Sequence, residues 1–134
     1  MKLDGKVAMV TGGASGIGKA TVIELAHCGA TVICADIDEK KGVEVAKEAK
    51  QTDVAVEFVA INLADKANIR STAAAVLAKH PRIDILVNAA GWGDIQPFIE
   101  NTPDYMERVI AINLGGGSVP GTTVLNMFVE TSEE

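Results

Sequence analysis

The fold of this chain is decided by the stretch Thr11-Gly12-Gly13-Ala14-Ser15-Gly16-Ile17-Gly18. It follows an apolar run, Val7–Val10, and opens a segment with helix-like spacing of apolar residues. Glycines at 12, 16 and 18 let the backbone turn tightly from strand to helix, and they leave no Cβ in the way of a phosphate group. We therefore expect a diphosphate to bind at the free N–H groups of the helix start.

Strand and helix signals alternate along the rest of the chain. The apolar runs predict buried strands over Lys6–Thr11, Thr31–Asp36, Val54–Asn62 and Ile83–Asn88. Helices are predicted over Ser15–Cys28, from Glu39 to about Lys50 behind a cap at Asp38, from Asp65 to about His80, and from Thr102-Pro103 to about Leu114. The first of these helices is indicated by Ile17, Ala20, Ile23 or Val22, and Ala26, which stand near helical spacing.

The predicted strands are continuous apolar runs, which is typical of parallel strands covered on both faces. With right-handed crossovers, they predict an α/β fold with a doubly wound parallel sheet in the strand order 3-2-1-4. Strands 1 and 4 then flank the point where a crevice opens at the carboxyl ends. The glycine stretch follows strand 1 and Asn88-Ala89-Ala90-Gly91 follows strand 4. Two separate motifs therefore converge on one crevice.

Composition excludes several other classes of protein. The 134 residues carry a net charge of −6 with a pI of about 4.9, which disfavours nucleic-acid and anionic-membrane partners. The residues are 48% hydrophobic and the mean hydropathy is +0.22, so a packed core is expected. No apolar stretch approaches the length of a membrane span, and residues 1–6 lack the apolar region of a signal peptide. These features favour a cytoplasmic protein.

The cysteines and histidines predict neither a disulfide nor a metal site. Cys34 is expected as a small core residue in a strand and Cys28 as a packing residue at a helix end. His27 and His80 stand at no ligand spacing from a cysteine or from each other.

The order of the motifs resembles the N-terminal half of a short-chain dehydrogenase/reductase, a family with a Rossmann-like sheet. The resemblance covers residues 3 to about 114 and rests on Thr11-Gly12-x-x-x-Gly16-Ile17-Gly18, Asp36-Ile37, Asn62-Leu63-Ala64-Asp65, Val87-Asn88-Ala89-Ala90-Gly91 and Ile112-Asn113-Leu114. It implies an NAD-binding half-domain over residues 1–114. Residues 88–98 and 112–115 look closest to members that act on acyl thioesters and cyclic alcohols.

The resemblance also implies roles for individual residues. The pyrophosphate would be held by Gly12, Ser15, Gly16, Ile17 and Gly18. Asp36, followed by Ile37, would accept hydrogen bonds from the adenosine ribose, and with Asp38 it would repel a 2′-phosphate, so NAD is favoured over NADP. Adenine would meet Asn62, where the family usually has aspartate, and Leu63. The cofactor ribose would pack on Asn88, Ala89, Ala90 and Gly91, with Ala89 replacing the family's second asparagine. Asn113 matches the active-site asparagine that kinks its helix and holds a proton-relay water.

The catalytic residues of the family are missing from the sequence. Hydride transfer in this family needs a tyrosine as general acid/base with a lysine four residues on, and a serine that holds the substrate oxygen. The one tyrosine, Tyr105, precedes Asn113 and has Val109 four residues on, so it is expected to be a packing residue. Trp92 and Phe98 stay open between lining a substrate pocket and packing within a loop.

Residues 115–134 differ in character from the rest. Gly115–Ser118 looks like a linker, and Val119-Pro120-Gly121-Thr122 resembles the family's Pro-Gly segment, which normally follows the catalytic tyrosine and lysine. We therefore expect an apparently truncated chain in which a stretch between about Leu114 and Val119 is deleted or simply missing from the sequence as written.

Three functions stay open at this point. One is an NAD-dependent oxidoreductase acting on a small-molecule secondary alcohol or ketone, with assembly into a homo-oligomer expected. The others are an inactive NAD-binding fragment, and a pseudoenzyme that pairs with a complete subunit.

Overall fold

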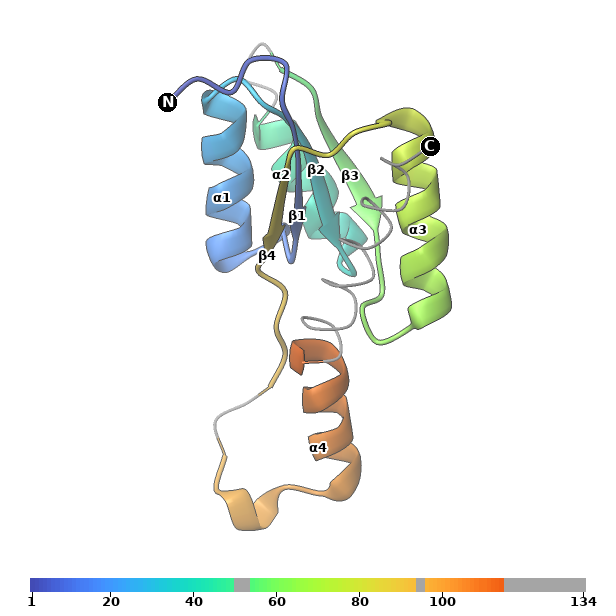
Figure 1. Ribbon diagram of the computed structural model, residues 1–134. Coiled ribbons are helices and arrows are strands. Elements are labelled where there is room, and N and C mark those ends of the chain that lie inside the picture. The colour runs from blue at the N-terminus through green and yellow to red at the C-terminus, as the bar shows by residue number, and fades with distance from the viewer. Residues whose placement is uncertain (50–53, 94–95, 115–134) are drawn as a thin grey trace.

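The computed structural model describes residues 1–49, 54–93 and 96–114 (Figure 1). Strands and helices alternate from the N-terminus as the sequence predicts. The strands are β1 (Val7–Thr11), β2 (Thr31–Asp36), β3 (Val56–Ala60) and β4 (Ile85–Asn88). The helices are α1 (Gly16–His27), α2 (Glu39–Ala49), α3 (Lys66–Lys79) and α4 (Pro103–Val109), with a short 3-10 helix η1 (Phe98–Glu100) and a π-helical turn η2 (Ile110–Leu114).

The four strands form one parallel sheet in the order β3-β2-β1-β4, which confirms the predicted topology. Val10 of β1 pairs with Cys34 of β2 on one side and with Val87 of β4 on the other. This register brings the ends of β1, β2 and β4 level with one another. The loops that follow these strands therefore leave the sheet along a common carboxyl edge.

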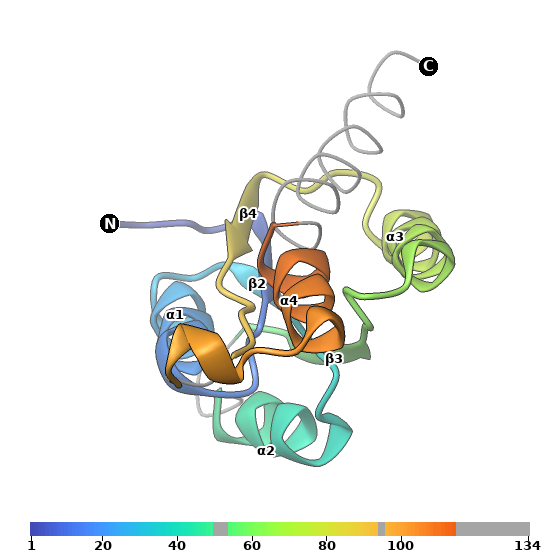
Figure 2. The same cartoon turned by 90° about the horizontal axis from the view of Figure 1, so that it is seen from below.

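Each face of the sheet has its own apolar core. On one face α1 and α2 pack against the sheet, with Val22 and Val45 buried beside Val10 and Cys34. On the other face Ile69 and Val76 of α3 join Met9, Ile33 and other strand residues. Seen from below, α1 and α2 lie on one side of the strands and α3 on the other (Figure 2). The two-sided cover explains why the strand sequences are continuously apolar.

The local signals for helix ends are also confirmed. The Asp65 carboxylate accepts hydrogen bonds from the backbone N–H groups of Ala67 and Asn68, and it thereby caps α3. After α1, Gly29 adopts a φ of +95°, the left-handed conformation that glycine provides at helix ends.

The buried face of α1 differs from the set of apolar residues that stand near helical spacing in the sequence. Ile17 is 82% exposed and Ala20 is exposed, whereas Gly18, Val22 and Ala26 form the buried face. The reason is the close approach of α1 to the loop before it: a Cβ at Gly18 would lie 2.0 Å from the carbonyl oxygen of Gly12. Because Gly18 must face that loop, the buried residues follow at steps of four from position 18.

The last predicted helix, Thr102-Pro103 to about Leu114, is divided in two. Thr102 caps it and Pro103 opens it as predicted, but the α-helix ends at Val109 and continues as the π-turn η2. No residue of α4 is buried. Figures 1 and 2 place α4 and η1 beyond the carboxyl edge of the sheet, away from its two covered faces. The expected linker 115–118 and the segment 119–134 lie outside the described residues.

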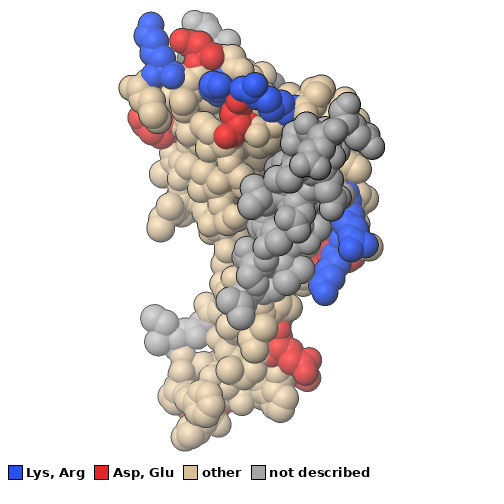
Figure 3. Space-filling view, viewed as in Figure 1, with Lys and Arg blue, Asp and Glu red and all other residues tan. Residues whose placement is uncertain are grey.

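Charged side chains gather at the opposite, amino edge of the sheet, at the top of Figure 3. The Asp84 carboxylate accepts a hydrogen bond from the backbone N–H of Val7 at 3.0 Å and pairs with Lys6 and Arg82. The Val7 hydrogen bond first, and then Arg82, lower the pKa of Asp84 to about 2. The residue just before β4 is thereby tied to the start of β1, far from the predicted crevice.

Candidate cofactor site

The predicted site residues come from loops that leave the carboxyl edge of the sheet. Thr11 at the end of β1 pairs with Ala35 of β2 and with Asn88 of β4. Its carbonyl oxygen accepts a hydrogen bond from the backbone N–H of Ala89 at 3.1 Å. The glycine loop after β1 and the loop after β4 are thus held side by side by the sheet itself.

The two loops touch so closely that only glycine fits at the contact. Gly12 has a φ of +70°, and a Cβ there would lie 2.6 Å from both the Cα and the backbone nitrogen of Ala90. Gly16 also has a positive φ, +53°, but a Cβ there would meet no heavy atom within 4 Å. One glycine therefore serves packing, while the other leaves open space at the start of α1.

The start of α1 has the donors that an anion needs. Ser15 stands at the N-cap with an extended backbone, and its side chain makes no capping hydrogen bond. The backbone N–H groups of the first turn have no helical acceptor by geometry, and the helix dipole favours negative charge there. With the open space at Gly16, this end of the helix fits a phosphate group.

Asp36 is fixed beside the glycine loop by two backbone donors. Its Oδ2 accepts from the N–H of Ala14 at 3.0 Å, and its Oδ1 accepts from the N–H of Asp38 at 3.0 Å. A carboxylate has about four acceptor positions, so both oxygens keep capacity for a further donor such as a ribose hydroxyl. The carboxylate is oriented before any ligand arrives.

Cys34 packs beneath the same loop and is free, as expected. A Cβ at Gly13 would lie 2.8 Å from its Sγ, and Cys34 is fully buried. Burial first, and then the charge of Asp36, raise the pKa of the thiol to about 11. The thiol stays protonated near neutral pH and behaves as a small core residue. Cys28, at the end of α1, is partly buried and also free.

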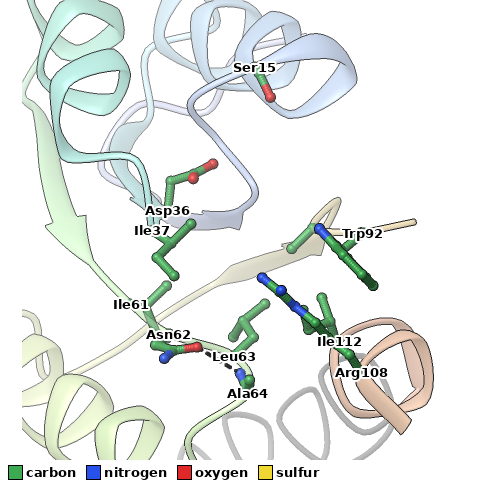
Figure 4. A pocket seen from close by; sticks show the side chains of 12 residues that line it. Ser15, Asp36, Ile37, Ile61, Asn62, Leu63, Ala64, Trp92, Arg108 and Ile112 are labelled. Atoms are coloured by element: carbon green, nitrogen blue, oxygen red, sulfur yellow. Dashed lines mark hydrogen bonds between the residues drawn. The ribbon is translucent and has the colours of Figure 1, made fainter. Parts of the chain in front are cut away.

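A cavity of about 190 Å³ opens where these loops meet (Figure 4). It is smaller than the roughly 300 Å³ at which pockets for whole drug-sized ligands begin, so it has room for only part of such a ligand. Seven predicted site residues line it: Ser15, Asp36, Ile37, Asn62, Leu63, Ala90 and Gly91. Its remaining lining residues are Ile61, Ala64, Trp92, Arg108 and Ile112.

The other predicted residues lie around this cavity without lining it. Gly12 and Gly18 form the packed base of the glycine loop, and Gly16 and Ile17 occupy the open start of α1. Asn88 is exposed at the end of β4 and Ala89 continues the adjoining loop. Asn62, which does line the cavity, is exposed, and its Oδ1 accepts a hydrogen bond from the backbone N–H of Ala64.

Asn113 joins α4 to the loop after β4. Its Oδ1 accepts from the backbone N–H of Trp92 at 3.0 Å, and its Nδ2 donates to the carbonyl oxygens of Trp92 and Val109. The bond to Val109 links the π-turn η2 to the last residue of α4, and such helical irregularities are often found at functional sites. The Asn113 side chain thus forms hydrogen bonds with both polar backbone groups of Trp92, a residue that lines the cavity.

Trp92 packs against neighbouring residues, which is one of the two arrangements that the sequence left open. It lines the cavity, and its ring also packs on Tyr105 with ring centroids 5.3 Å apart. Tyr105 is therefore a packing residue of this cluster, as predicted. Phe98 is 78% exposed in η1 and is not among the residues that line this cavity.

Arg108 was missed by the sequence analysis. Its guanidinium carbon lies 4.3 Å from the centroid of the Trp92 ring, and the side chain reaches from α4 toward the cavity (Figure 4). The available signal was its position five residues before Asn113, which places it on an earlier turn of the same helical segment.

No helix in the described part of the chain is long and apolar enough to cross a membrane. No group of three or more histidine, cysteine or acidic side chains in those residues could hold a metal ion.

Known proteins share this sequence pattern. A family model described as "short chain dehydrogenase" matches residues 6–133. The 3-oxoacyl-[acyl-carrier-protein] reductase FabG of Thermotoga maritima is 39% identical over 116 residues, which cover 87% of this chain and 47% of the relative. D-threitol dehydrogenase of Mycolicibacterium smegmatis is 39% identical over 115 residues, covering 86% of this chain and 44% of the relative. The chain therefore spans a little under half the length of these relatives.

Solved structures share the fold. A metagenomic short-chain oxidoreductase in complex with NADP superposes with a TM-score of 0.87 at 34% identity, covering 96% of this chain and 57% of that chain. A hydroxysteroid dehydrogenase from Escherichia coli gives a TM-score of 0.83 at 28% identity, covering 92% and 52%. The matched region includes the sheet, the glycine loop and Asp36, and this chain belongs to the short-chain dehydrogenase family.

Proposed function

We propose that residues 1–114 form the NAD-binding half of an oxidoreductase that transfers a hydride between NAD and a small secondary alcohol or ketone. The observation that carries this proposal is the fixed carboxylate of Asp36 on the wall of a cavity that adjoins the glycine loop. A carboxylate at the end of the second strand is the usual acceptor for the ribose hydroxyls of a dinucleotide.

Each part of the proposed site has a matching part of the cofactor. The pyrophosphate would lie at the start of α1, near Gly12, Ser15, Gly16, Ile17 and Gly18. The adenosine would lie near Asp36, Ile37, Asn62 and Leu63, and the ribose would pack on the loop Asn88, Ala89, Ala90 and Gly91. Asn113 would act at the reacting end of the site. The bound cofactor supplies the hydride chemistry, and these residues supply binding and orientation.

The preference for NAD over NADP rests on charge. A 2′-phosphate on the ribose would come close to the Asp36 carboxylate, and Asp38 adds a second negative charge nearby. In NAD the same carboxylate meets hydroxyl donors. The solved neighbour with NADP makes this preference the part of the proposal most in need of a test.

A cofactor titration tests the proposal. Trp92 is the single tryptophan and lines the cavity, so energy transfer from its ring to bound NADH reports binding at this site. Asp36→Ala should weaken the binding of NADH by about 10- to 100-fold, which corresponds to the loss of hydrogen bonds to a charged group. It should also reduce the difference in affinity between NADH and NADPH.

The matched control is Asp38→Asn. It removes one neighbouring negative charge, but Asp38 caps α2 at Lys41 and is not among the residues that line the cavity. NADH affinity should change little in this variant. If NADPH binds the unmodified protein as tightly as NADH does, the assignment of NAD is wrong.

A second candidate function is cofactor binding without catalysis. The observation in its favour is the absence of a Tyr-x-x-x-Lys sequence from these 134 residues. An assay with NAD and a panel of secondary alcohols separates the two candidates. Turnover that copurifies with the 134-residue species supports the oxidoreductase, and binding without turnover supports the fragment. Turnover that requires a second, complete chain supports the pairing of subunits.

Location and assembly stay predictions. We propose a reducing, cytoplasmic compartment, which the two free cysteines favour. Assembly into a homo-oligomer is proposed from the family alone.

A further inference from the structure

We propose that Arg108 contacts the adenine base of the nucleotide and thereby positions the adenosine end of the cofactor. This inference rests on the proposed function, because it assumes a nucleotide in the cavity beside Asp36. It extends that function by assigning a binding role to a residue of α4, outside the motifs that identify the family.

The first observation is the charge of the cavity. Among its lining residues, Asp36 and Arg108 carry the only formal charges. Asp36 is held by two backbone N–H groups, as described above. The Arg108 guanidinium forms no ion pair with any carboxylate of the described residues, although Asp104 stands one turn earlier on α4. A cation without a carboxylate partner therefore borders the cavity.

The second observation is the way this cation is held. The guanidinium carbon lies 4.3 Å from the centroid of the Trp92 ring, and that ring also packs on Tyr105. Trp92 in turn is fixed at both of its backbone polar groups by Asn113. The planar guanidinium is thus supported by an aromatic stack, and stacking leaves its N–H donors available.

The third observation is the direction of the side chain. Figure 4 shows Arg108 reaching from α4 across the cavity toward Leu63 and Ile37, with Trp92 on the side of the loop after β4. Asp36 marks the position of the ribose. The base attached to that ribose then meets the apolar residues next to Asp36, namely Ile37, Ile61 and Leu63. Arg108 reaches the same apolar residues from the opposite wall of the cavity, which α4 forms.

The chemistry of adenine matches this arrangement. The base is a flat π-system with ring-nitrogen acceptors, so a guanidinium can stack on its face or donate to its edge. The aliphatic stem of Arg108 adds an apolar surface beside Ile112. A cation in this position also attracts phosphates, and the test must separate the base from the phosphates.

The test compares binding of four nucleotides to the purified protein by calorimetry: NAD, NADP, AMP and nicotinamide mononucleotide. Arg108→Gln should weaken both NAD and AMP by about 3- to 30-fold, the range of a cation–π contact. Nicotinamide mononucleotide has a phosphate but no adenine, so its affinity should be unchanged. Arg108→Lys keeps the positive charge but lacks the planar guanidinium group. It should reduce the affinity for NAD and AMP less than Arg108→Gln does.

The matched control is Arg70→Gln, which removes an exposed arginine on α3 that does not line this cavity. It should leave all four affinities unchanged. An equal loss for nicotinamide mononucleotide and AMP in Arg108→Gln would assign Arg108 to phosphate and overturn the proposal. A loss of affinity confined to NADP would assign Arg108 to the 2′-phosphate and would also overturn the proposal. An unchanged affinity for AMP would overturn the proposal as well. If the unmodified protein binds none of the nucleotides, the proposed function itself fails.

Discussion

The sheet with its three covering helices and the segment around α4 are held together by different forces. In the sheet, Met9, Val10 and Ile33 are fully buried, and helices pack against both faces. In α4 no residue is buried, and the segment is joined to the rest through Asn113 and the Trp92 stack. The cavity lies between the two regions. One wall is therefore set by apolar packing and the other by a few polar and aromatic contacts.

This difference predicts that substitutions in the sheet region alter folding, whereas those around α4 alter the cavity. Gly12→Ala should give the largest effect. The new Cβ would lie 2.6 Å from the backbone of Ala90, and the alanine would have to adopt a φ of +70°. We therefore expect a loss of about 2–5 kcal/mol in the free energy of unfolding. Chemical denaturation measures this loss.

The control for that experiment is Gly5→Ala. Gly5 has a similar φ of +74°, but a Cβ there would meet nothing within 4 Å. Only the backbone strain remains, and the expected loss is about 1–2 kcal/mol. Equal losses in the two variants would show that the contact between the two loops contributes nothing to the free energy of unfolding. That result would contradict the stated difference between the sheet region and the α4 region.

Asn113→Ala should act on the α4 region with a smaller effect on stability. It removes the hydrogen bonds that hold the Trp92 backbone, and we expect a loss of about 1 kcal/mol because water can replace them at this exposed position. The Trp92 emission should move to longer wavelength as the ring becomes more hydrated. Asn113→Asp retains the acceptor for the Trp92 N–H and should shift the emission less. An unchanged emission in both variants would show that Asn113 does not position Trp92.

The smallest effect concerns the amino edge of the sheet. The pKa of Asp84 is lowered from 3.8 to about 2, so the carboxylate binds protons more weakly in the folded protein than in the unfolded chain. Its contribution to stability is therefore present above about pH 4 and is lost as the pH falls through about 2. The difference in stability between the unmodified protein and Asp84→Asn should shrink over that interval. A difference that stays constant from pH 5 to about pH 2 would contradict the assigned pairing.

Local signals predicted the sheet well because each of them is decided by a few neighbouring residues. The strand Thr31–Asp36 was predicted with its observed bounds, and Asp65 was identified as the residue that starts α3. The strand at Val54–Asn62 was predicted too long, since only Val56–Ala60 pairs with β2. An apolar run marks what can be buried, and the pairing partner sets where the ladder ends.

The cavity was predicted only in part. Its residues from the sheet loops, such as Asp36 and Leu63, follow motifs that can be read along the chain. Arg108 and Ile112 enter from α4, whose placement depends on contacts across the molecule, including the Asn113 bond to Trp92. The buried face of α1 shows the same limit, because helical spacing alone does not reveal that Gly18 faces the glycine loop.

We propose that a dinucleotide binds along the carboxyl edge of the sheet, between β1 and β4. This proposal can be tested by following the backbone amide NMR shifts of the purified protein during a titration with NAD. We expect the shifts to concentrate at Gly12–Gly18, Asp36–Ile37, Asn62–Leu63 and Asn88–Gly91. Shifts that concentrate instead around Glu57 and Lys79, which line a separate cavity, or the absence of saturable shifts, would contradict it.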